Sequence, residues 1–125
     1  MRRPQFPKNT KTKFAKANKQ AEREDDMKVI IVEPMKQPYE KEIGELKEMR
    51  EIVGGNIQAV FPYPENVALI CNEEGKLLPL PQNTYIPELR DIIFGTFLIC
   101  GCGVEDFCSL SEEQVKRYIN LFKIR

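Results

Sequence analysis

The most apolar stretch of the chain, Asp91–Gly101 (DIIFGTFLICG), limits the folds that are open to it. It is far shorter than the ~20 apolar residues that a helix needs to cross a bilayer, so no membrane partner is expected. Its β-branched and aromatic residues favour a strand, and so apolar a strand is predicted to lie at the centre of a sheet. Gly95 inside it indicates a bulge or a close approach of another part of the backbone.

The remaining strands are predicted from shorter β-branched or alternating runs. They are Met27–Glu33, Tyr39–Ile43 and Asn56–Tyr63. Asn66–Cys71 and Lys76–Leu80 flank the polar segment Asn72–Gly75, a pattern that predicts a hairpin closed by a type I turn and a left-handed glycine. Gln82–Arg90 and Gly101–Phe107 are predicted to be loops.

Two helices are predicted, and each has a local signal at one of its ends. Gly44–Val53 carries apolar residues at helical spacing, and Gly54-Gly55 provides a stop because glycine tolerates the left-handed conformation that ends helices. Ser111 and Gln114 form a capping box at the start of the last helix. The apolar stripe of that helix consists of Val115, Tyr118, Ile119 and Phe122. The sequence therefore predicts an α+β fold, with a small antiparallel or mixed sheet of about five strands, two helices, and the C-terminal helix packed on the sheet.

Charge divides the chain at residue 26. Residues 1–26 carry eight basic and four acidic side chains, a net charge of +4, whereas the remainder carries 11 basic and 15 acidic side chains, a net charge of −4. The first segment has no periodicity that could bury a face, so we interpret it as a flexible basic arm before a single domain, residues 27–125. Such an arm can bind nucleic-acid phosphates or simply be solvated. The N-terminus lacks the apolar segment of a secretory signal, and the expected location is the cytoplasm.

Several short motifs of the domain occur together in one known family. They are Val32-Glu33-Pro34, Val53-Gly54-Gly55, Cys71-Asn72-Glu73-Glu74-Gly75-Lys76-Leu77, Leu80-Pro81 with Asn83, Asp91-Ile92-Ile93 with Gly95-Thr96-Phe97, and Asp106-Phe107 with Ser109-Leu110. In this order, and over about residues 27–123, the sequence resembles the family known as domain of unknown function 3846. The resemblance implies a protein of bacteria, phages, plasmids or conjugative elements, without an established activity or catalytic set. Thr84 stands where the family usually has a basic residue, and the loop from Thr84 to Arg90 also differs from the family.

The four cysteines leave two interpretations open. Cys71 and Cys100 sit in apolar runs and are expected to be small, reduced core residues. Alternatively, Cys100, Cys102 and Cys108, with Cys71 as a fourth ligand, offer thiolates for a zinc or iron–sulfur site. The C-x-C spacing has no matching second pair and the chain has no histidine, so structural thiols are favoured, and no metal or other cofactor is expected.

Five polar residues are candidates for a ligand site. Glu33 ends the first buried strand, where a carboxylate can bind backbone amides or a ligand. Asn72 and Asn83 flank the second arm of the predicted hairpin, and with Arg90 and Asp91 they form a candidate polar cleft at one end of the sheet. The alternative for each is structural, because asparagine commonly bonds its own turn backbone and a carboxylate can cap a strand.

Three functions are compatible with these residues. The preferred hypothesis is a non-catalytic protein of a mobile element that binds a host protein or a small-molecule ligand and modulates host defence. It agrees with the resemblance, the small size and the absence of histidine. An enzyme would need Glu33, Asn83 and Asp91 to cluster in one pocket with raised carboxylate pKa values. A nucleic-acid-binding accessory protein would act through residues 1–26.

Overall fold

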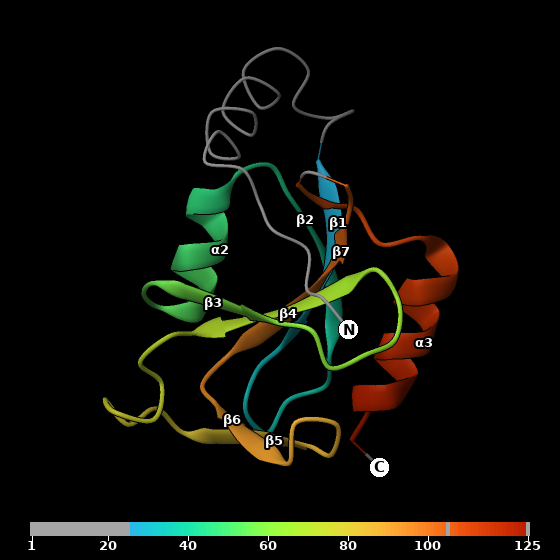
Figure 1. Ribbon diagram of the computed structural model, residues 1–125. Coiled ribbons are helices and arrows are strands. Elements are labelled where there is room, and N and C mark those ends of the chain that lie inside the picture. The colour runs from blue at the N-terminus through green and yellow to red at the C-terminus, as the bar shows by residue number, and fades with distance from the viewer. Residues whose placement is uncertain (1–25, 105, 125) are drawn as a thin grey trace.

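The computed structural model describes residues 26–104 and 106–124, and its centre is a six-stranded antiparallel sheet (Figure 1). The strands of this sheet are β1 (Met27–Val32), β2 (Tyr39–Ile43), β3 (Ile57–Val60), β4 (Val67–Asn72), β7 (Phe97–Cys102) and β8 (Phe107–Cys108). Their order is β2-β1-β7-β4-β3, and β8 pairs with β7. A separate two-stranded sheet consists of β5 (Gln82–Ile86) and β6 (Asp91–Phe94). With the helices α2 (Leu46–Val53) and α3 (Glu112–Phe122), the predicted α+β class is confirmed.

The three middle strands form the core because they are apolar on both faces. In β7, Ile99 pairs with Ile30 of β1 on one side and with Leu69 of β4 on the other. Every residue of β4 and β7 is buried. Alternate side chains enter two separate apolar clusters, one on each face of the sheet. The prediction of a central apolar strand is confirmed for the β7 part of Asp91–Gly101.

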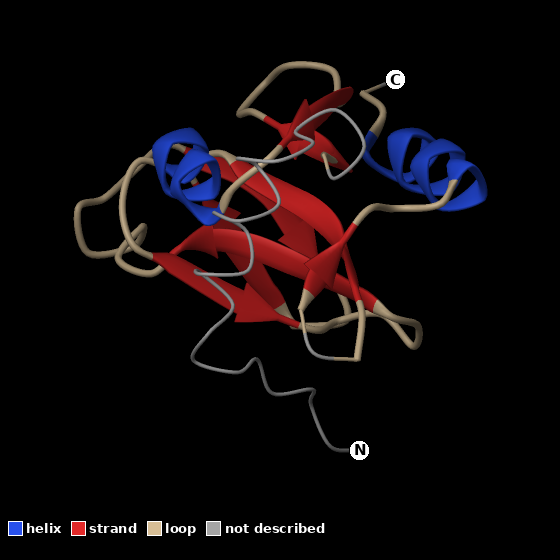
Figure 2. Cartoon of the chain, turned by 90° about the horizontal axis from the view of Figure 1, so that it is seen from above, coloured by secondary structure: helices blue, strands red, loops and turns tan. Residues whose placement is uncertain are grey.

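Each face of the sheet is covered by different elements. On one face α2 inserts Met49 and Val53 into the cluster formed with Val29, Ile31 and Leu98, among others. On the other face α3 contributes Tyr118 and Phe122, and the β5–β6 sheet contributes Ile86 and Ile93. Figure 1 shows α2 and α3 on opposite sides of the sheet, and Figure 2 shows the small sheet apart from the larger one. The prediction that the C-terminal helix packs on the sheet through its apolar stripe is confirmed.

The helix ends follow their local signals. Gly54 ends α2 in the left-handed conformation, with φ of 82°, and its N–H donates to the carbonyl of Arg50 at 2.8 Å. At the start of α3 the Gln114 N–H donates to Ser111 Oγ at 3.1 Å, and the Ser111 N–H donates to Gln114 Oε1 at 2.9 Å. The capping box predicted for Ser111 and Gln114 is therefore present.

The predicted hairpin around Asn72–Gly75 is wrong. Residues 73–79 form consecutive turns, in which the N–H groups of Leu77 and Leu78 donate to the carbonyl of Glu74 at 3.0 and 3.1 Å. Local backbone bonds therefore satisfy this segment, and β4 finds both of its partners elsewhere in the sheet, in β3 and β7. The loop predicted over Gln82–Arg90 is wrong as well, because its first half is β5.

Asp91–Gly101 is not one strand. It is divided at Gly95, whose φ of 87° belongs to the left-handed region that favours glycine. The bend sends β6 into the small sheet and β7 into the large one. A Cβ at Gly95 would lie 2.5 Å from Leu80 Cδ1, so the expected close approach is present, although to a side chain rather than to backbone. Gly101 and Cys102, predicted to begin a loop, instead end β7 and pair with β8.

Two further predictions concern the N-terminal arm and membrane-spanning helices. The basic arm, residues 1–26, lies outside the described residues except for Asp26. Within residues 26–104 and 106–124, no helix is long and apolar enough to cross a membrane.

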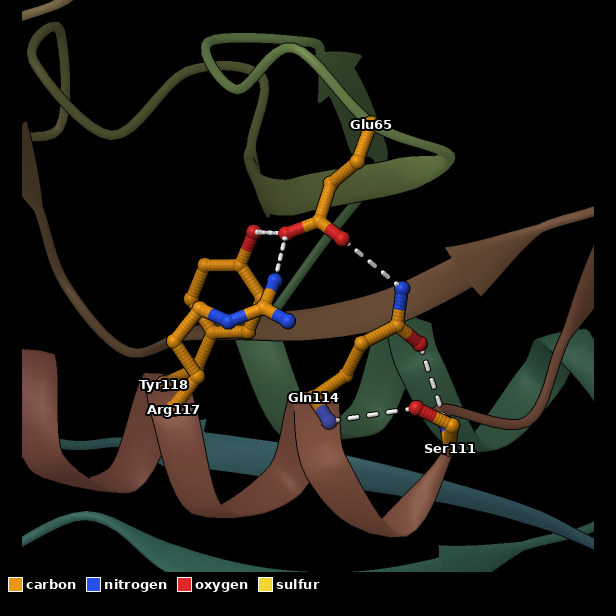
Figure 3. A network of polar contacts seen from close by, with 5 residues as sticks. All are labelled: Glu65, Ser111, Gln114, Arg117 and Tyr118. Carbon is orange, nitrogen blue, oxygen red and sulfur yellow. Dashed lines mark hydrogen bonds and ion pairs between the residues drawn. The ribbon is translucent and has the colours of Figure 1, made fainter.

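A polar network ties the connection between β3 and β4 to α3 (Figure 3). The Glu65 carboxylate accepts hydrogen bonds from the Tyr118 hydroxyl, from the Arg117 guanidinium and, at 3.1 Å, from Gln114 Nε2. The Tyr118 ring also packs on Tyr63, with 5.2 Å between centroids. The hydrogen bond from Tyr118, followed by those from Arg117 and Gln114, holds the pKa of Glu65 below its usual value against the opposing effect of burial.

We expect Glu65→Gln to lower the free energy of unfolding by about 1–2 kcal/mol at pH 7, because hydrogen bonds to a charged group are lost. The folded-state pKa of Glu65 lies below its unfolded value, so the stabilisation is present above about pH 5 and is lost as the pH falls through the folded-state pKa. Urea unfolding at pH 7 and pH 3 measures this, and the difference between variant and wild type should shrink at pH 3. Glu42→Gln, on an exposed strand position, is the control; an equal loss there, or a difference independent of pH, contradicts the prediction.

Candidate functional site

A cleft of about 360 Å³ lies between β3 and β4 of the large sheet, the turns that follow β4, and β6. Residues with functional groups or exposed apolar surface at this cleft include Gln58, Cys71, Asn72, Glu73, Lys76, Leu77 and Asp91. Its volume lies at the lower end of the range for small-molecule sites in proteins, about 300–1,000 Å³. The cleft can therefore hold a small ligand or one long side chain of a partner.

The sheet supplies a thiol and an amide to the cleft. Gln58 of β3 pairs with Cys71 of β4, so their side chains point to the same face of the sheet. The Cys71 thiol donates a weak hydrogen bond to Gln58 Oε1, with 3.9 Å between the heavy atoms. Burial, and secondarily the nearby Asp91 carboxylate, raises the pKa of Cys71 to about 11. The thiol is therefore protonated at neutral pH and is a poor nucleophile.

An ion pair forms one wall of the cleft. Lys76 Nζ lies 2.6 and 2.7 Å from the two carboxylate oxygens of Asp91, and the Ile92 N–H donates to Asp91 Oδ1 at 2.8 Å. The hydrogen bond from Lys76, followed by that from Ile92, lowers the pKa of Asp91. Glu73 adds a second carboxylate, so the side chains lining the cleft carry a net charge of −1. This balance favours a cationic group in the ligand.

The cleft also presents apolar surface to a ligand. Leu77, in the turns after β4, is 82% exposed, although it lines the cleft. Leu89, Ile92 and Ile93 line it from the side of the small sheet. Apolar surface with a few converging polar groups is typical of ligand sites. The arrangement suits a ligand with an apolar body and a positively charged end.

The structure brings two of the five predicted site residues to the cleft, Asn72 and Asp91. Asn72 is buried, and both ends of its amide bind backbone: Nδ2 donates to the Val53 carbonyl at 3.1 Å, and Oδ1 accepts from the Glu74 N–H at 2.7 Å. Asn72 therefore holds the end of α2 and the turn after β4 in place. Asp91 lines the cleft with its carboxylate paired to Lys76.

The other three predicted residues do not line this cleft. Asn83 Nδ2 donates to the carbonyls of Val32 and Gly95 at 2.8 and 2.9 Å, which joins the end of β1 to the bend between β6 and β7. Glu33 accepts a hydrogen bond from the Tyr39 hydroxyl at 2.9 Å and forms an ion pair with Lys36 at 3.4 Å. Arg90 has a φ of 53° in the turn before β6. Asn83 has the structural role that was its alternative interpretation.

Sequence reasoning missed five of the residues named for the cleft: Gln58, Cys71, Glu73, Lys76 and Leu77. Cys71 was interpreted as core, which its burial supports, and Lys76 and Leu77 were assigned to a hairpin strand that does not exist. The one signal that could have found Gln58 is its place as a polar residue between the apolar Ile57 and Ala59. That alternation indicates a strand with one polar face.

The cysteine alternatives can be compared with the geometry. Cys100 is fully buried in the cluster beneath α2, and Cys71 and Cys102 are also buried, whereas Cys108 is exposed. Burial, followed by the neighbouring Cys102 and Cys108, raises the pKa of Cys100 well above the usual value for a thiol. Within the described part of the chain, no three His, Cys, Asp or Glu side chains are grouped so that they could hold a metal ion. This arrangement favours structural thiols for Cys71, Cys100 and Cys102.

Comparison with known protein families identifies the family of this chain. The family model of the domain of unknown function DUF3846 matches residues 27–123. No curated protein and no solved structure matches the chain. The matched segment begins at the first residue of β1 and extends beyond the end of α3, so it includes both sheets, both helices and every residue of the cleft. The chain therefore belongs to the DUF3846 family.

Proposed function

We propose that this protein is a non-catalytic binding module whose ligand places a cationic group and an apolar segment in the cleft between β3, the turns after β4, and β6. The observation that carries the proposal is the combination, in one cleft of about 360 Å³, of the carboxylates of Glu73 and Asp91 with the exposed side chain of Leu77. Charge attracts the ligand's cation, and the leucine covers its apolar part.

The chemistry of the cleft favours binding over catalysis. A nucleophilic thiol needs a lowered pKa, and that of Cys71 is raised. A carboxyl group that acts as a general acid or base at neutral pH needs a raised pKa, and that of Asp91 is lowered. The enzyme hypothesis also required Glu33 and Asn83 beside Asp91, and of these three only Asp91 lines the cleft.

We extend the proposal to the setting that the resemblance implies, a phage, plasmid or conjugative element within a bacterial cytoplasm. There the ligand would belong to the host, as part of a protein or as a small molecule, and its capture would modulate host defence. The lining and the volume of the cleft support the chemical half of this proposal, namely the charge and size of the bound group.

A pair of small probes tests the chemical half. We expect Nα-acetyl-lysine methylamide, whose side-chain ammonium is free, to bind in the millimolar range. It should shift the amide NMR resonances of Gln58, Lys76 and Ile92. Acetyl-norleucine methylamide, which has a similar apolar stem without the charge, should bind at least about fivefold more weakly, as expected for about 1 kcal/mol of attraction between screened charges.

Two protein variants complete the test. Glu73→Gln should weaken binding of the lysine probe about fivefold, because one carboxylate of the cleft is neutralised. Glu33→Gln makes the same change of net charge outside the cleft and should leave the affinity unchanged. Equal binding of the two probes, or equal effects of the two variants, would reject the proposed site.

A further inference from the structure

The two edge strands of the large sheet are chemically different. At one edge, β2 exposes the charged residues Glu40, Lys41 and Glu42. At the other edge, β3 consists of Ile57, Gln58, Ala59 and Val60 and carries no charge. Charged side chains on an edge strand discourage pairing with another chain, and an uncharged edge permits it. The β3 edge is therefore the one that can accept a further strand.

The hydrogen-bond register shows which backbone groups of β3 face outward. The Glu73 N–H donates to the Asn56 carbonyl at 2.9 Å, and the pairing of Ile57 with Asn72 continues the same register. Hydrogen-bonded and non-hydrogen-bonded pairs alternate along an antiparallel ladder. The N–H and C=O groups of Ile57 and Ala59 consequently point away from β4, toward the side of β3 on which no strand lies within residues 26–104 and 106–124.

The free edge adjoins the cleft. Gln58 and Val60 alternate along β3 with Ile57 and Ala59, whose backbone groups point outward. Both Gln58 and Val60 line the cleft. A strand added along β3 would place every second side chain on the same face as these two, with Cβ atoms about 5 Å from theirs. Backbone pairing would supply affinity, and the cleft would select one side chain, as in other cases of strand addition.

We propose that β3 is a docking edge for an extended segment of a partner protein, and that a lysine or arginine of this segment enters the cleft. The choice of a basic residue rests on the proposed function, in which the net charge of −1 and the apolar surface of Leu77 attract a cation on an apolar stem. Lysine and arginine have such stems and a charged end. A strand in this position extends the large sheet by one strand.

A second copy of this chain fits the edge less well. Antiparallel pairing of two β3 strands would bring together only Ile57, Gln58, Ala59 and Val60 of each copy. None of these residues is a cation that could meet Glu73 and Asp91 in the cleft. Charge complementarity therefore favours a different chain that carries a basic residue within an extended segment.

The probe for this proposal is a nine-residue peptide of alternating threonine and valine, with lysine at its central position in the threonine series. We expect it to bind at least about tenfold more tightly than acetyl-lysine methylamide, because backbone hydrogen bonds are added. At saturation, hydrogen exchange of the Ile57 and Ala59 amides should slow at least about tenfold. The amides of β2, at the opposite edge, should not change.

N-methylation of the peptide separates strand addition from capture of the lysine alone. One isomer carries methyl groups on the valine amides, and the other carries them on the threonine and lysine amides. Successive amides of a strand point to opposite sides, so only one isomer can still pair with β3. We expect one isomer to bind like the parent peptide and the other to bind at least about tenfold more weakly.

The outcomes distinguish this inference from the proposed function. If the lysine methylamide binds but the peptide binds no more tightly, or if both N-methylated isomers bind like the parent, strand addition is overturned and the cleft proposal stands. If neither the methylamide nor the peptide binds, both are overturned. A third outcome is that hydrogen exchange at Ile57 and Ala59 slows as the protein concentration is raised in the absence of peptide. That result would identify a second copy of the chain as the occupant and would overturn the inference.

Discussion

Replacing Phe97 by alanine is expected to lower the free energy of unfolding by about 3–5 kcal/mol, the range measured when a buried phenylalanine is truncated. Phe97 is the first residue of β7 and is completely buried beneath α3. Its ring meets that of Phe122 edge to face, with 5.4 Å between the centroids. The truncation would therefore leave a cavity between the sheet and α3. Urea unfolding followed by circular dichroism measures the loss.

Two further variants serve as controls for Phe97→Ala. Phe97→Leu retains most of the side-chain volume and should cost about 1–2 kcal/mol. Leu121→Ala removes an apolar side chain of α3 that is 53% exposed and should change stability by less than about 0.5 kcal/mol. If Phe97→Ala and Leu121→Ala had similar effects, the packing of α3 on the sheet would have to be different from the one described.

Gly95→Ala is expected to lower the free energy of unfolding by about 2–5 kcal/mol. The left-handed backbone at φ of 87° costs about 1–2 kcal/mol for a residue with a Cβ. The new methyl group would also lie 2.5 Å from Leu80 Cδ1 and 3.1 Å from Leu80 Cβ, and overpacking of this kind costs about 1–3 kcal/mol. Thermal and urea unfolding of the variant measure the sum.

The background of Leu80→Ala separates the two causes. Shortening Leu80 removes the Cδ1 contact but leaves the backbone conformation of Gly95 unchanged. Gly95→Ala should therefore cost less in this background, by the part of the overpacking that Leu80 Cδ1 causes. The cost of about 1–2 kcal/mol from the left-handed conformation remains, together with the milder approach to the Cβ of residue 80 at 3.1 Å. An unchanged cost in the Leu80→Ala background would mean that the contact contributes nothing.

Features that depend on neighbouring residues were predictable from the sequence. The capping box of Ser111 and Gln114 forms within one turn, and the stop at Gly54 needs only the left-handed conformation of one residue. The strand Tyr39–Ile43 has the predicted bounds, and its partner β1 lies just before it along the chain, on the other side of one short reversal. In each case the stabilising contacts lie close together along the chain.

Features that depend on distant residues were not predictable in the same way. The hairpin predicted for Asn66–Leu80 fails because β4 obtains a better partner in β7, an apolar strand about thirty residues later. The strand β5 escaped prediction because Gln82–Ile86 has few apolar residues, and it forms by pairing with β6. The apolar run Asp91–Gly101 is divided at Gly95 between two sheets, and this division could not be derived from composition alone.

The candidate site shows the same division. Asp91 was identified because it was expected, with Arg90 and the two asparagines, to form a polar cleft at one end of the sheet. Gln58 and Lys76 were not, because their place in the cleft requires β3, the turns after β4, and β6 to meet. Lys76 contacts Asp91, 15 positions later in the sequence. The predicted hairpin would instead have paired the segment of Lys76 with Asn66–Cys71.

The position of β7 between β1 and β4 also has a consequence for synthesis on the ribosome. The two hairpins, β1–β2 and β3–β4, emerge first, and each presents an apolar strand with an open edge until residue 102 has been made. The sheet closes only when the last third of the chain arrives, through contacts of high sequence separation that fold slowly. A nascent chain interrupted after β6 would hold two unjoined apolar edges, which makes it a substrate for chaperones and prone to aggregation.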